Sequence, residues 1–220
     1  TSKPPATIEW GMRNLKDAID IFGQWAEQGK DVGMEKGHAS SVDEMLDFAL
    51  EERLNIGKKF SFLDLGCGNG WVVRKVQEHD LCNKAIGIDG AYQMIDNAIK
   101  VGGHDDYILA DINTCIPPRR FDLIHSMEVL YYLADPAEKV KNFFDDWLEE
   151  KGRLIVGIDH YFENLDSHSW EEKVGTTMLM LKEAEWIEIF NESGLSEVRS
   201  WRANSSKDWP GTLVLTGKKG

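Results

Sequence analysis

Between residues 60 and 71 the order of apolar and polar positions changes from one recognisable pattern to another. Residues 60–64 (Phe-Ser-Phe-Leu-Asp) alternate large apolar side chains and end in an acid, which predicts a buried strand. Gly66, Gly68 and Gly70 follow within five residues, and an apolar-periodic segment opens at Trp71. The pattern predicts a strand, a tight glycine turn and a helix, the first part of a nucleotide-binding βαβ unit.

A second predicted strand covers residues 84–89 and also ends in an acid. Asp89 lies nineteen positions after Gly70, where a carboxylate is expected to accept hydrogen bonds from a ribose. The glycines suit a turn whose backbone must approach a ligand closely, because a Cβ would intrude there. Nicotinamide-binding proteins are the nearest alternative, but they usually space their glycines as GxGxxG, whereas this chain has GxGxG.

Two helices are predicted before the first strand. Residues 13–28 carry a one-faced apolar stripe, and a capping box at residues 41–44 marks the start of a second helix that ends near Gly57. Between them, residues 29–39 are punctuated by glycine, which predicts an irregular loop that could act as a lid. Residues 1–9 predict a loose arm.

The rest of the chain alternates predicted helices and strands, as expected of an α/β protein. Helices are predicted at 71–78, 91–100, 136–147 and 183–192, and further strands at 107–110, 121–125, 152–158, 195–201 and 212–217.

Five stretches resemble, in order, the motifs of the class I S-adenosylmethionine (SAM) dependent methyltransferases. The resemblance covers residues 60–217 and is nearest to the small-molecule branch, methyltransferase types 11 and 25. It is carried by residues 63–70 (LDLGCGNG), 87–89 (GID), 109–112 (LADI), 121–130 (FDLIHSMEVL) and 152–156 (GRLIV).

This resemblance implies a Rossmann-like sheet of seven mostly parallel strands, with the last strand antiparallel and helices on both faces. Residues 1–59 are then expected to form an arm and two helices that cap the site. Residues 60–220 are expected to form the SAM-binding core, with a substrate-recognition insertion at about 159–181.

The same resemblance implies which residues bind SAM and its product S-adenosylhomocysteine. The glycine turn and the helix amides after it should hold the amino-acid end, Asp89 the ribose and Asp111 the adenine amine. Asp111 has an alternative role as a helix N-cap. The expected cofactor-binding residues are Asp64, Gly66, Cys67, Gly68, Gly70, Asp89, Gly90, Asp111, Ile112 and Met127.

The segment after the fourth strand bears on the methyl acceptor. It contains neither Asn/Asp-Pro-Pro-Tyr nor a Pro-Cys nucleophile, which argues against amino-methylating DNA and glutamine enzymes and against cytosine C5 chemistry. His160 and Tyr161, directly after the fifth strand, are the predicted catalytic residues, and a hydroxyl acceptor would need a base such as His160 or His38. A surface excursion without a role in binding is an alternative for this insertion. The predicted substrate-binding residues are Glu128, Tyr132, His38 and Trp170.

Net charge, cysteine content and the absence of targeting segments limit the expected partners, metal sites and location. With 25 basic and 38 acidic residues the net charge is −13, which disfavours nucleic acid and anionic membranes as partners. Three cysteines without paired spacing indicate neither a disulfide framework nor a zinc site, and His160, His168 and Glu163 form no compact metal-binding pattern. No signal peptide or membrane-spanning run is evident, so we expect a cytoplasmic protein; its oligomeric state is not indicated.

Three functions therefore stay open. The first is transfer of the SAM methyl group to the nitrogen, sulfur or oxygen of a small molecule, which the acidic surface favours. The second is methylation of a protein or RNA, and the third is SAM binding without catalysis.

Overall fold

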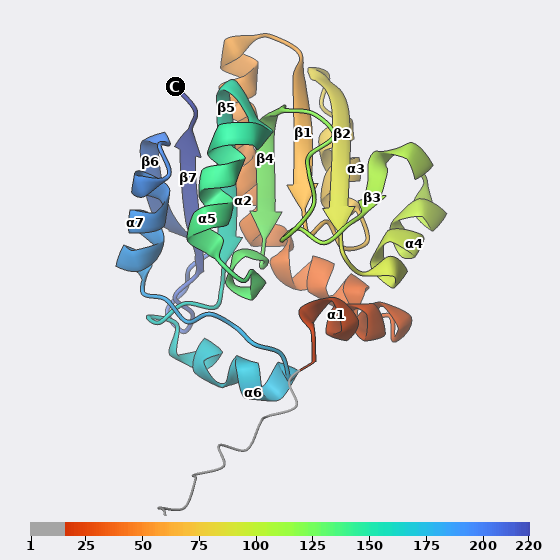
Figure 1. Cartoon of the computed structure of the whole chain (residues 1–220), viewed down its shortest axis with the longest axis vertical. Helices are drawn as coiled ribbons and strands as arrows, with labels where there is room; N and C mark the ends of the chain where they lie inside the picture. The colour runs from red at the N-terminus through yellow and green to blue at the C-terminus, as the bar shows by residue number, and fades with distance from the viewer. Residues whose placement is uncertain (1–15) are drawn as a thin grey trace, which may run out of the picture.

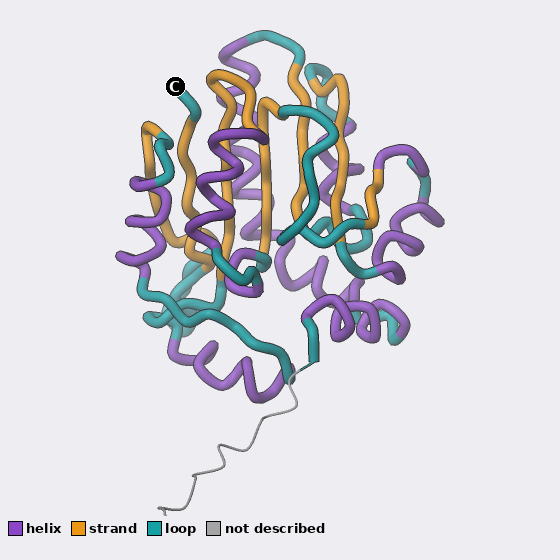
Figure 2. The backbone as a smooth tube through the Cα atoms, viewed as in Figure 1, coloured by secondary structure: helices purple, strands orange, loops and turns teal. Residues whose placement is uncertain are grey.

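A seven-stranded sheet, covered by helices on both faces, forms the centre of the computed structural model, which describes residues 16–220 (Figures 1 and 2). The strand order is β3-β2-β1-β4-β5-β7-β6. The strands are β1 (Phe60–Leu65), β2 (Cys82–Asp89), β3 (Tyr107–Leu109), β4 (Phe121–Met127), β5 (Leu148–Ile158), β6 (Ser196–Ala203) and β7 (Thr212–Lys218).

Strand β7 alone runs against the other six. It pairs antiparallel with both β5 and β6, whereas β1, β2, β3, β4 and β5 pair in parallel. The expected fold class is therefore confirmed. Because β1 lies between β2 and β4, the direction of winding reverses there, and the crevice outside the carboxyl ends of these strands is the usual ligand site of such sheets.

The helices divide between the two faces and the carboxyl edge of the sheet. Helices α2 and α3 lie behind the sheet in Figure 1, α5 and α7 lie in front, and α1 and α6 lie below the strand ends. None of the helices in residues 16–220 is long and apolar enough to cross a membrane. The helices are α1 (Ala18–Glu27), α2 (Asp31–Ile56), α3 (Trp71–Gln77), α4 (Tyr92–Val101), α5 (Pro136–Asn142), α6 (Trp170–Val174) and α7 (Glu183–Glu192), with shorter turns η1 (His104–Asp106), η2 (Leu130–Tyr132), η3 (Phe143–Trp147) and η4 (Leu165–Ser169).

Each face of the sheet has its own apolar core, because successive side chains of a strand point to opposite faces. Leu63 and Leu65 of β1 pack into the core that contains Trp186 of α7, whereas Phe62 packs into the core that contains Met45 of α2. All of these side chains are buried. The near-continuous apolar character of the central strands follows from this two-sided burial.

The largest departure from the sequence prediction is α2. Residues 29–39 were predicted to be an irregular loop and residues 41–44 a helix start, but a single helix runs from Asp31 to Ile56. Gly33 and Gly37 lower the local helix propensity. Tertiary contacts outweigh that cost, since the side chains of Asp31 and Glu35 accept hydrogen bonds from Asn69 in the glycine turn. The predicted lid loop is thus replaced by a rigid helix.

Smaller differences concern the ends of elements. Helix α1 begins at Ala18, where the Asp17 side chain accepts from the backbone N–H of Ile19, rather than at residue 13. The predicted arm at residues 1–9 lies outside the described residues. Strand β5 begins at Leu148, earlier than predicted, because a single π-helical turn (η3) ends at Trp147 and leads directly into it.

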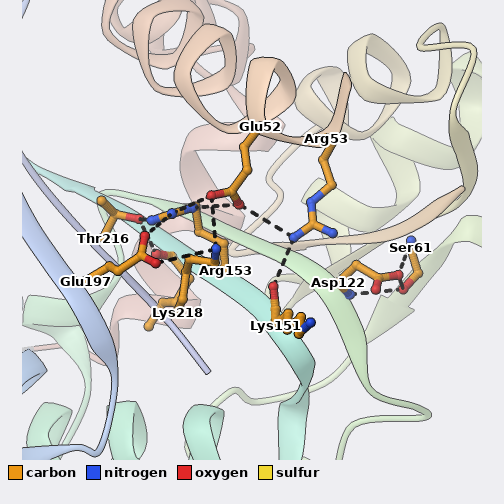
Figure 3. A network of polar contacts seen from close by, with 10 residues as sticks. Glu52, Arg53, Ser61, Asp122, Lys151, Arg153, Glu197, Thr216 and Lys218 are labelled. Carbon is orange, nitrogen blue, oxygen red and sulfur yellow. Dashed lines mark hydrogen bonds and ion pairs between the residues drawn. The ribbon is translucent and has the colours of Figure 1, made fainter. Parts of the chain in front are cut away.

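A network of charged side chains holds the second half of α2 against strands β5 and β7 (Figure 3). The guanidinium of Arg153 on β5 donates to both carboxylate oxygens of Glu52 at 3.1 and 2.6 Å, and also to Thr216 Oγ1 at 2.9 Å. Lys218 of β7 lies 3.6 Å from the same carboxylate. Burial raises the pKa of Glu52, but the hydrogen bond and charge of Arg153 outweigh burial, so the pKa lies below its usual value.

Replacing Glu52 by Gln should therefore destabilise the fold in a pH-dependent way. A carboxyl group whose pKa is lowered by folding contributes stability that is complete above about pH 4.5 and is lost as the pH falls through the folded-state pKa. We expect Glu52→Gln to lower the free energy of unfolding by about 1–3 kcal/mol at pH 7, and by progressively less below about pH 4.5. Urea unfolding across this range, with the exposed neighbour Glu51→Gln as control, measures the effect; a loss independent of pH would contradict it.

Candidate active site

A cavity of about 490 Å³ opens at the carboxyl edge of the sheet, beneath the turns that follow β1, β2 and β4. Its walls come from these turns and from α1, α2 and α6. Its volume falls in the range of about 300–1,000 Å³ that is typical of small-molecule sites.

The glycine turn brings backbone directly to the cavity wall. Gly66 has a φ of 71°, and a Cβ there would lie 2.3 Å from Cγ2 of Val129, so no larger residue fits. Gly68 has a φ of 52°, and a Cβ there would meet no protein atom closer than 3.9 Å, at Met94 Sδ. The space beside Gly68 is therefore part of the cavity, and a ligand can lie against the peptide backbone at this point.

Asp89 ties this turn to the next one. Its Oδ2 accepts from the Gly68 N–H at 2.9 Å and its Oδ1 accepts from the Ala91 N–H at 2.8 Å. Burial raises the pKa of Asp89, and the two backbone hydrogen bonds offset part of that increase. Since each carboxylate oxygen has a second lone pair, the side chain can still accept from a ligand in the cavity that it lines.

Asp64 and His125 form a buried pair, of which only Asp64 was predicted to be a site residue. Asp64, a predicted site residue, lies with its Oδ1 2.8 Å from Nδ1 of His125, which sequence reasoning treated only as part of a strand. The two residues are register partners on β1 and β4, so strand pairing alone would have revealed their contact. Both line the cavity, and Nε2 of His125 has no hydrogen-bond partner among residues 16–220.

Most of the other predicted cofactor-side residues also line the cavity, namely Cys67, Gly90, Asp111, Ile112 and Met127. Asp111 combines both roles considered for it, because it lines the cavity while its Oδ1 accepts from the backbone N–H of Asn113 at 2.9 Å in a turn. Gly70 is the exception. It precedes α3 with a φ of 80° and lies against the ring of Tyr107, away from the cavity lining.

All four predicted substrate-binding residues also line the cavity: His38 on α2, Glu128 after β4, Tyr132 in η2 and Trp170 on α6. Glu128 has the uncommon φ of 62°. The Tyr131 hydroxyl donates to its Oε2 at 2.5 Å, and its Oε1 accepts from the backbone N–H of Asp159. The carboxylate thus bridges the ends of β4 and β5.

Glu128, His38 and the neighbouring Asp159 form a group of titratable side chains whose pKa values are shifted. Burial, followed by the charge of Asp159, raises the pKa of Glu128 well above its usual range. Burial likewise raises the pKa of Asp159 and lowers that of His38, although each charge partly offsets the shift of the other. Perturbed groups at the end of a cavity are typical of functional sites.

The two predicted catalytic residues do not line the cavity. The Tyr161 hydroxyl donates to the Gly211 carbonyl at 2.7 Å and accepts from Arg202 at 2.6 Å. The whole side chain is buried in the core that contains Trp186. The His160 ring is buried between Tyr131 and Trp170, with Nδ1 3.1 Å from the Ser167 carbonyl. Both predictions rested on proximity to the strand end, but the chain turns there and directs these side chains into the protein.

The lining also includes residues that were not predicted as site residues, among them Asp31, Glu35 and Asn69. The Asn69 amide donates to both acids, at 3.3 and 3.1 Å, and so joins the glycine turn to α2. Their i, i+4 spacing would have been a signal if residues 31–38 had been treated as a helix.

The cavity has a roof made of two segments that are distant in sequence. The backbone N–H of Lys16 donates to the carbonyl of Gly175, directly after α6, at 2.9 Å. Phe22 of α1 packs edge-on against Tyr132 with ring centroids 5.2 Å apart. The N-terminal segment and the insertion therefore meet over the site and both contact the core.

The strand order, the single antiparallel strand, the glycine turn and the acids at the ends of β2 and β3 define a class I SAM-dependent methyltransferase. The chain belongs to the family of this methyltransferase domain, because the family model described as "Methyltransferase domain" matches residues 13–199.

Curated relatives match over parts of the chain. A probable (S)-tetrahydroprotoberberine N-methyltransferase 2 of Papaver bracteatum is 27% identical over 150 residues, which are 61% of this chain and 41% of that protein. A trans-aconitate 2-methyltransferase of Streptomyces avermitilis is 26% identical over 130 residues, which are 52% of this chain and 48% of that one. The chain therefore spans less than half the length of these relatives.

Solved structures match more completely. A Haloferax volcanii structure, described as a complex between the Trm112 methyltransferase activator and the putative methyltransferase, has a TM-score of 0.76 and 25% identity, covering 94% of this chain and 99% of that one. A Thermotoga maritima protein, described as a SAM-dependent methyltransferase and possible histamine N-methyltransferase, has a TM-score of 0.63 at 18% identity, covering 91% and 99%. The latter likeness concerns the fold alone.

The chain thus carries a methyltransferase domain of the SAM-dependent class. This confirms the family and the cofactor expected from the motifs.

The close approach at Gly66 generates a testable prediction. Gly66→Ala should destabilise the fold by about 1–2 kcal/mol from the positive φ and by about 1–3 kcal/mol more from the clash with Val129. It should also weaken S-adenosylhomocysteine binding, because the turn must shift. Gly29→Ala is a matched control, since Gly29 has the same φ of 71° with no atom within 4 Å of the added Cβ. Urea unfolding and calorimetry on both variants measure the effects. Equal losses of stability in the two variants would show that the contact with Val129 costs nothing, which would contradict the prediction.

Proposed function

We propose that the protein transfers the methyl group of SAM to a small-molecule acceptor bound in the roofed cavity. The observation that carries this proposal is the roof itself. The contact between Lys16 and Gly175 and the packing of Phe22 on Tyr132 enclose a space of about 490 Å³ over the strand ends. A small metabolite fits such a space, whereas a protein chain or RNA strand needs an open cleft.

The chemistry of the donors suits SAM at the end nearest the glycine turn. The exposed backbone at Gly68 lies against the cavity, Asp89 has lone pairs for a ribose, and Asp111 can accept from the adenine amine beside the apolar Ile112. When bound, SAM supplies a methyl group on a sulfonium that is already activated for displacement. The chain's own residues then have to hold the cofactor and align it.

The opposite end of the cavity would hold the acceptor. We place the acceptor beside Trp170, Tyr132, Glu128 and His38, which line the cavity, and the roof would limit the access of water to it. Alignment of two reactants in this way can lower the barrier by about 7–11 kcal/mol. A neutral amine or a thiolate needs only to arrive deprotonated, whereas a hydroxyl needs a base. Of the two histidines considered for that role, His38 lines the cavity and His160 does not.

A second candidate is a macromolecular acceptor or an activating protein partner. The observation that favours it is the Haloferax volcanii neighbour, which is described with a Trm112 activator and resembles almost the whole of this chain. The net charge of −13 argues against RNA as the acceptor.

We also propose a reducing, cytoplasmic location, which the free cysteines Cys67, Cys82 and Cys115 support.

The ribose assignment predicts the effect of Asp89→Asn. The amide would direct an NH₂ group at one of the two backbone N–H groups that the carboxylate now accepts from, and it would accept less well from a ribose. We expect S-adenosylhomocysteine binding to weaken by about 1–3 kcal/mol. Calorimetry measures this, with Asp105→Asn, whose side chain is fully exposed, as control. Unchanged affinity would exclude the ribose role.

The acceptor class can be tested by incubating the protein with methyl-labelled SAM and a cell extract separated by size. Label in the small-metabolite fraction that is lost with Asp89→Asn is the expected result, and mass spectrometry can then name the acceptor. Label on protein or RNA would overturn the small-molecule proposal. A parallel incubation with a purified Trm112-type activator would show whether turnover requires such a partner.

A further inference from the structure

Three potential metal ligands meet at the acceptor end of the cavity. They are a ring nitrogen of His38 and one carboxylate oxygen each from Glu128 and Asp159, and all three atoms lie within 4.8 Å of one another. They come from α2, from the turn after β4 and from the residue after β5. Because 38, 128 and 159 are far apart in sequence, no spacing pattern could reveal them.

The spacing of the three atoms suits a metal ion. Whenever three atoms lie within 4.8 Å of one another, some point lies within about 2.8 Å of all three. Bonds from carboxylate oxygen and imidazole nitrogen to a divalent cation are about 2.0–2.6 Å long. Small rotations of these side chains would therefore close the site around an ion, without any movement of the backbone.

One oxygen of Asp159 lacks a hydrogen-bond partner among the described residues. Asp159 is 7% exposed, and its Oδ1 is buried with no hydrogen-bond donor among residues 16–220. A buried carboxylate oxygen without a donor costs free energy, so such an atom points to a missing cation or proton donor. This observation is independent of the clustering of the three residues.

Glu128 is oriented as a metal ligand would be. The Tyr131 hydroxyl and the backbone N–H of Asp159 each donate to one of its oxygens, which fixes the carboxylate and leaves a lone pair on each oxygen. Hydrogen bonds of this kind behind the ligands are typical of metal sites. Within the described part of the chain, neither Glu128 nor the buried Asp159 forms an ion pair with a lysine or arginine.

We propose that His38, Glu128 and Asp159 bind a divalent transition-metal ion such as Mn²⁺ or Zn²⁺ at the acceptor end of the cavity. One imidazole and two carboxylates form a mixed set that favours these ions over Mg²⁺ and Ca²⁺, which prefer oxygen ligands alone. His38 and Glu128 line the cavity and Asp159 lies behind them, so the open coordination positions face the acceptor. The ion would hold an oxygen of the acceptor and lower the pKa of a bound hydroxyl group.

The site can be tested with the metal alone, without knowledge of the acceptor. Wild-type protein is freed of metal with a chelator and titrated with MnCl₂, while the signal of free Mn²⁺ is followed by electron paramagnetic resonance; ZnCl₂ is titrated by calorimetry. One site per chain is expected. His38→Ala and Asp159→Asn should each weaken binding more than about tenfold, the lower limit seen when even an outer-shell partner is lost.

Two matched controls separate this site from general attraction of cations. Glu172→Gln removes an exposed carboxylate of α6, the helix beside the cavity, and His168→Ala removes an exposed histidine; neither side chain lines the cavity. Both should bind Mn²⁺ as the wild type does. Retained S-adenosylhomocysteine binding shows that each variant is folded.

Absence of stoichiometric Mn²⁺ and Zn²⁺ binding by the wild type, or binding that His38→Ala and Asp159→Asn retain, would overturn the proposal. If those variants do not fold, crystals of the wild type soaked in MnCl₂ decide the question. An anomalous-difference peak between the three side chains supports the site, and a peak elsewhere or none refutes it. These readouts do not involve methyl transfer, so they stay valid whatever the acceptor is.

Discussion

The two hydrogen bonds that the Asp89 carboxylate accepts are the contact on which the cavity depends. They join the glycine turn after β1 to the start of α4 after β2, and so fix the distance between the two loops. Asn69 then joins the same turn to α2 through Asp31 and Glu35. A chain of short polar contacts therefore runs from the sheet to α2, and each contact uses backbone or side-chain groups that would be costly to leave unpaired in the interior.

Local patterns sufficed to predict the sheet and the cofactor end of the site. Alternation from Phe60 and the glycines after Leu65 are short-range signals, and the functional groups there lie within a few residues of a strand end. The position of a strand end in the sequence is therefore close to its position in the site. This is why the sequence alone predicts that Asp64, Asp89 and Asp111 belong to the site, and all three line the cavity.

The acceptor end could not be predicted to the same extent, since its geometry is set by tertiary contacts. Gly33 and Gly37 reduce helix propensity, and only the contacts of Asp31 and Glu35 with Asn69 show why α2 continues through them. His160 and Tyr161 lie beside a strand end, yet their side chains are taken up by the core. Distance along the chain carries no information about which way a side chain points after a turn.

The meeting of Lys16 with Gly175 also bears on turnover. The roof joins residues 16 and 175, which lie far apart in the sequence, so entry of an acceptor past this contact would require the two segments to separate. Opening of a lid occurs on the microsecond to millisecond timescale and limits many enzymes after chemistry is complete. Under the proposed function, substitutions around Lys16 and Gly175 would therefore change the overall rate while leaving the methyl-transfer step intact.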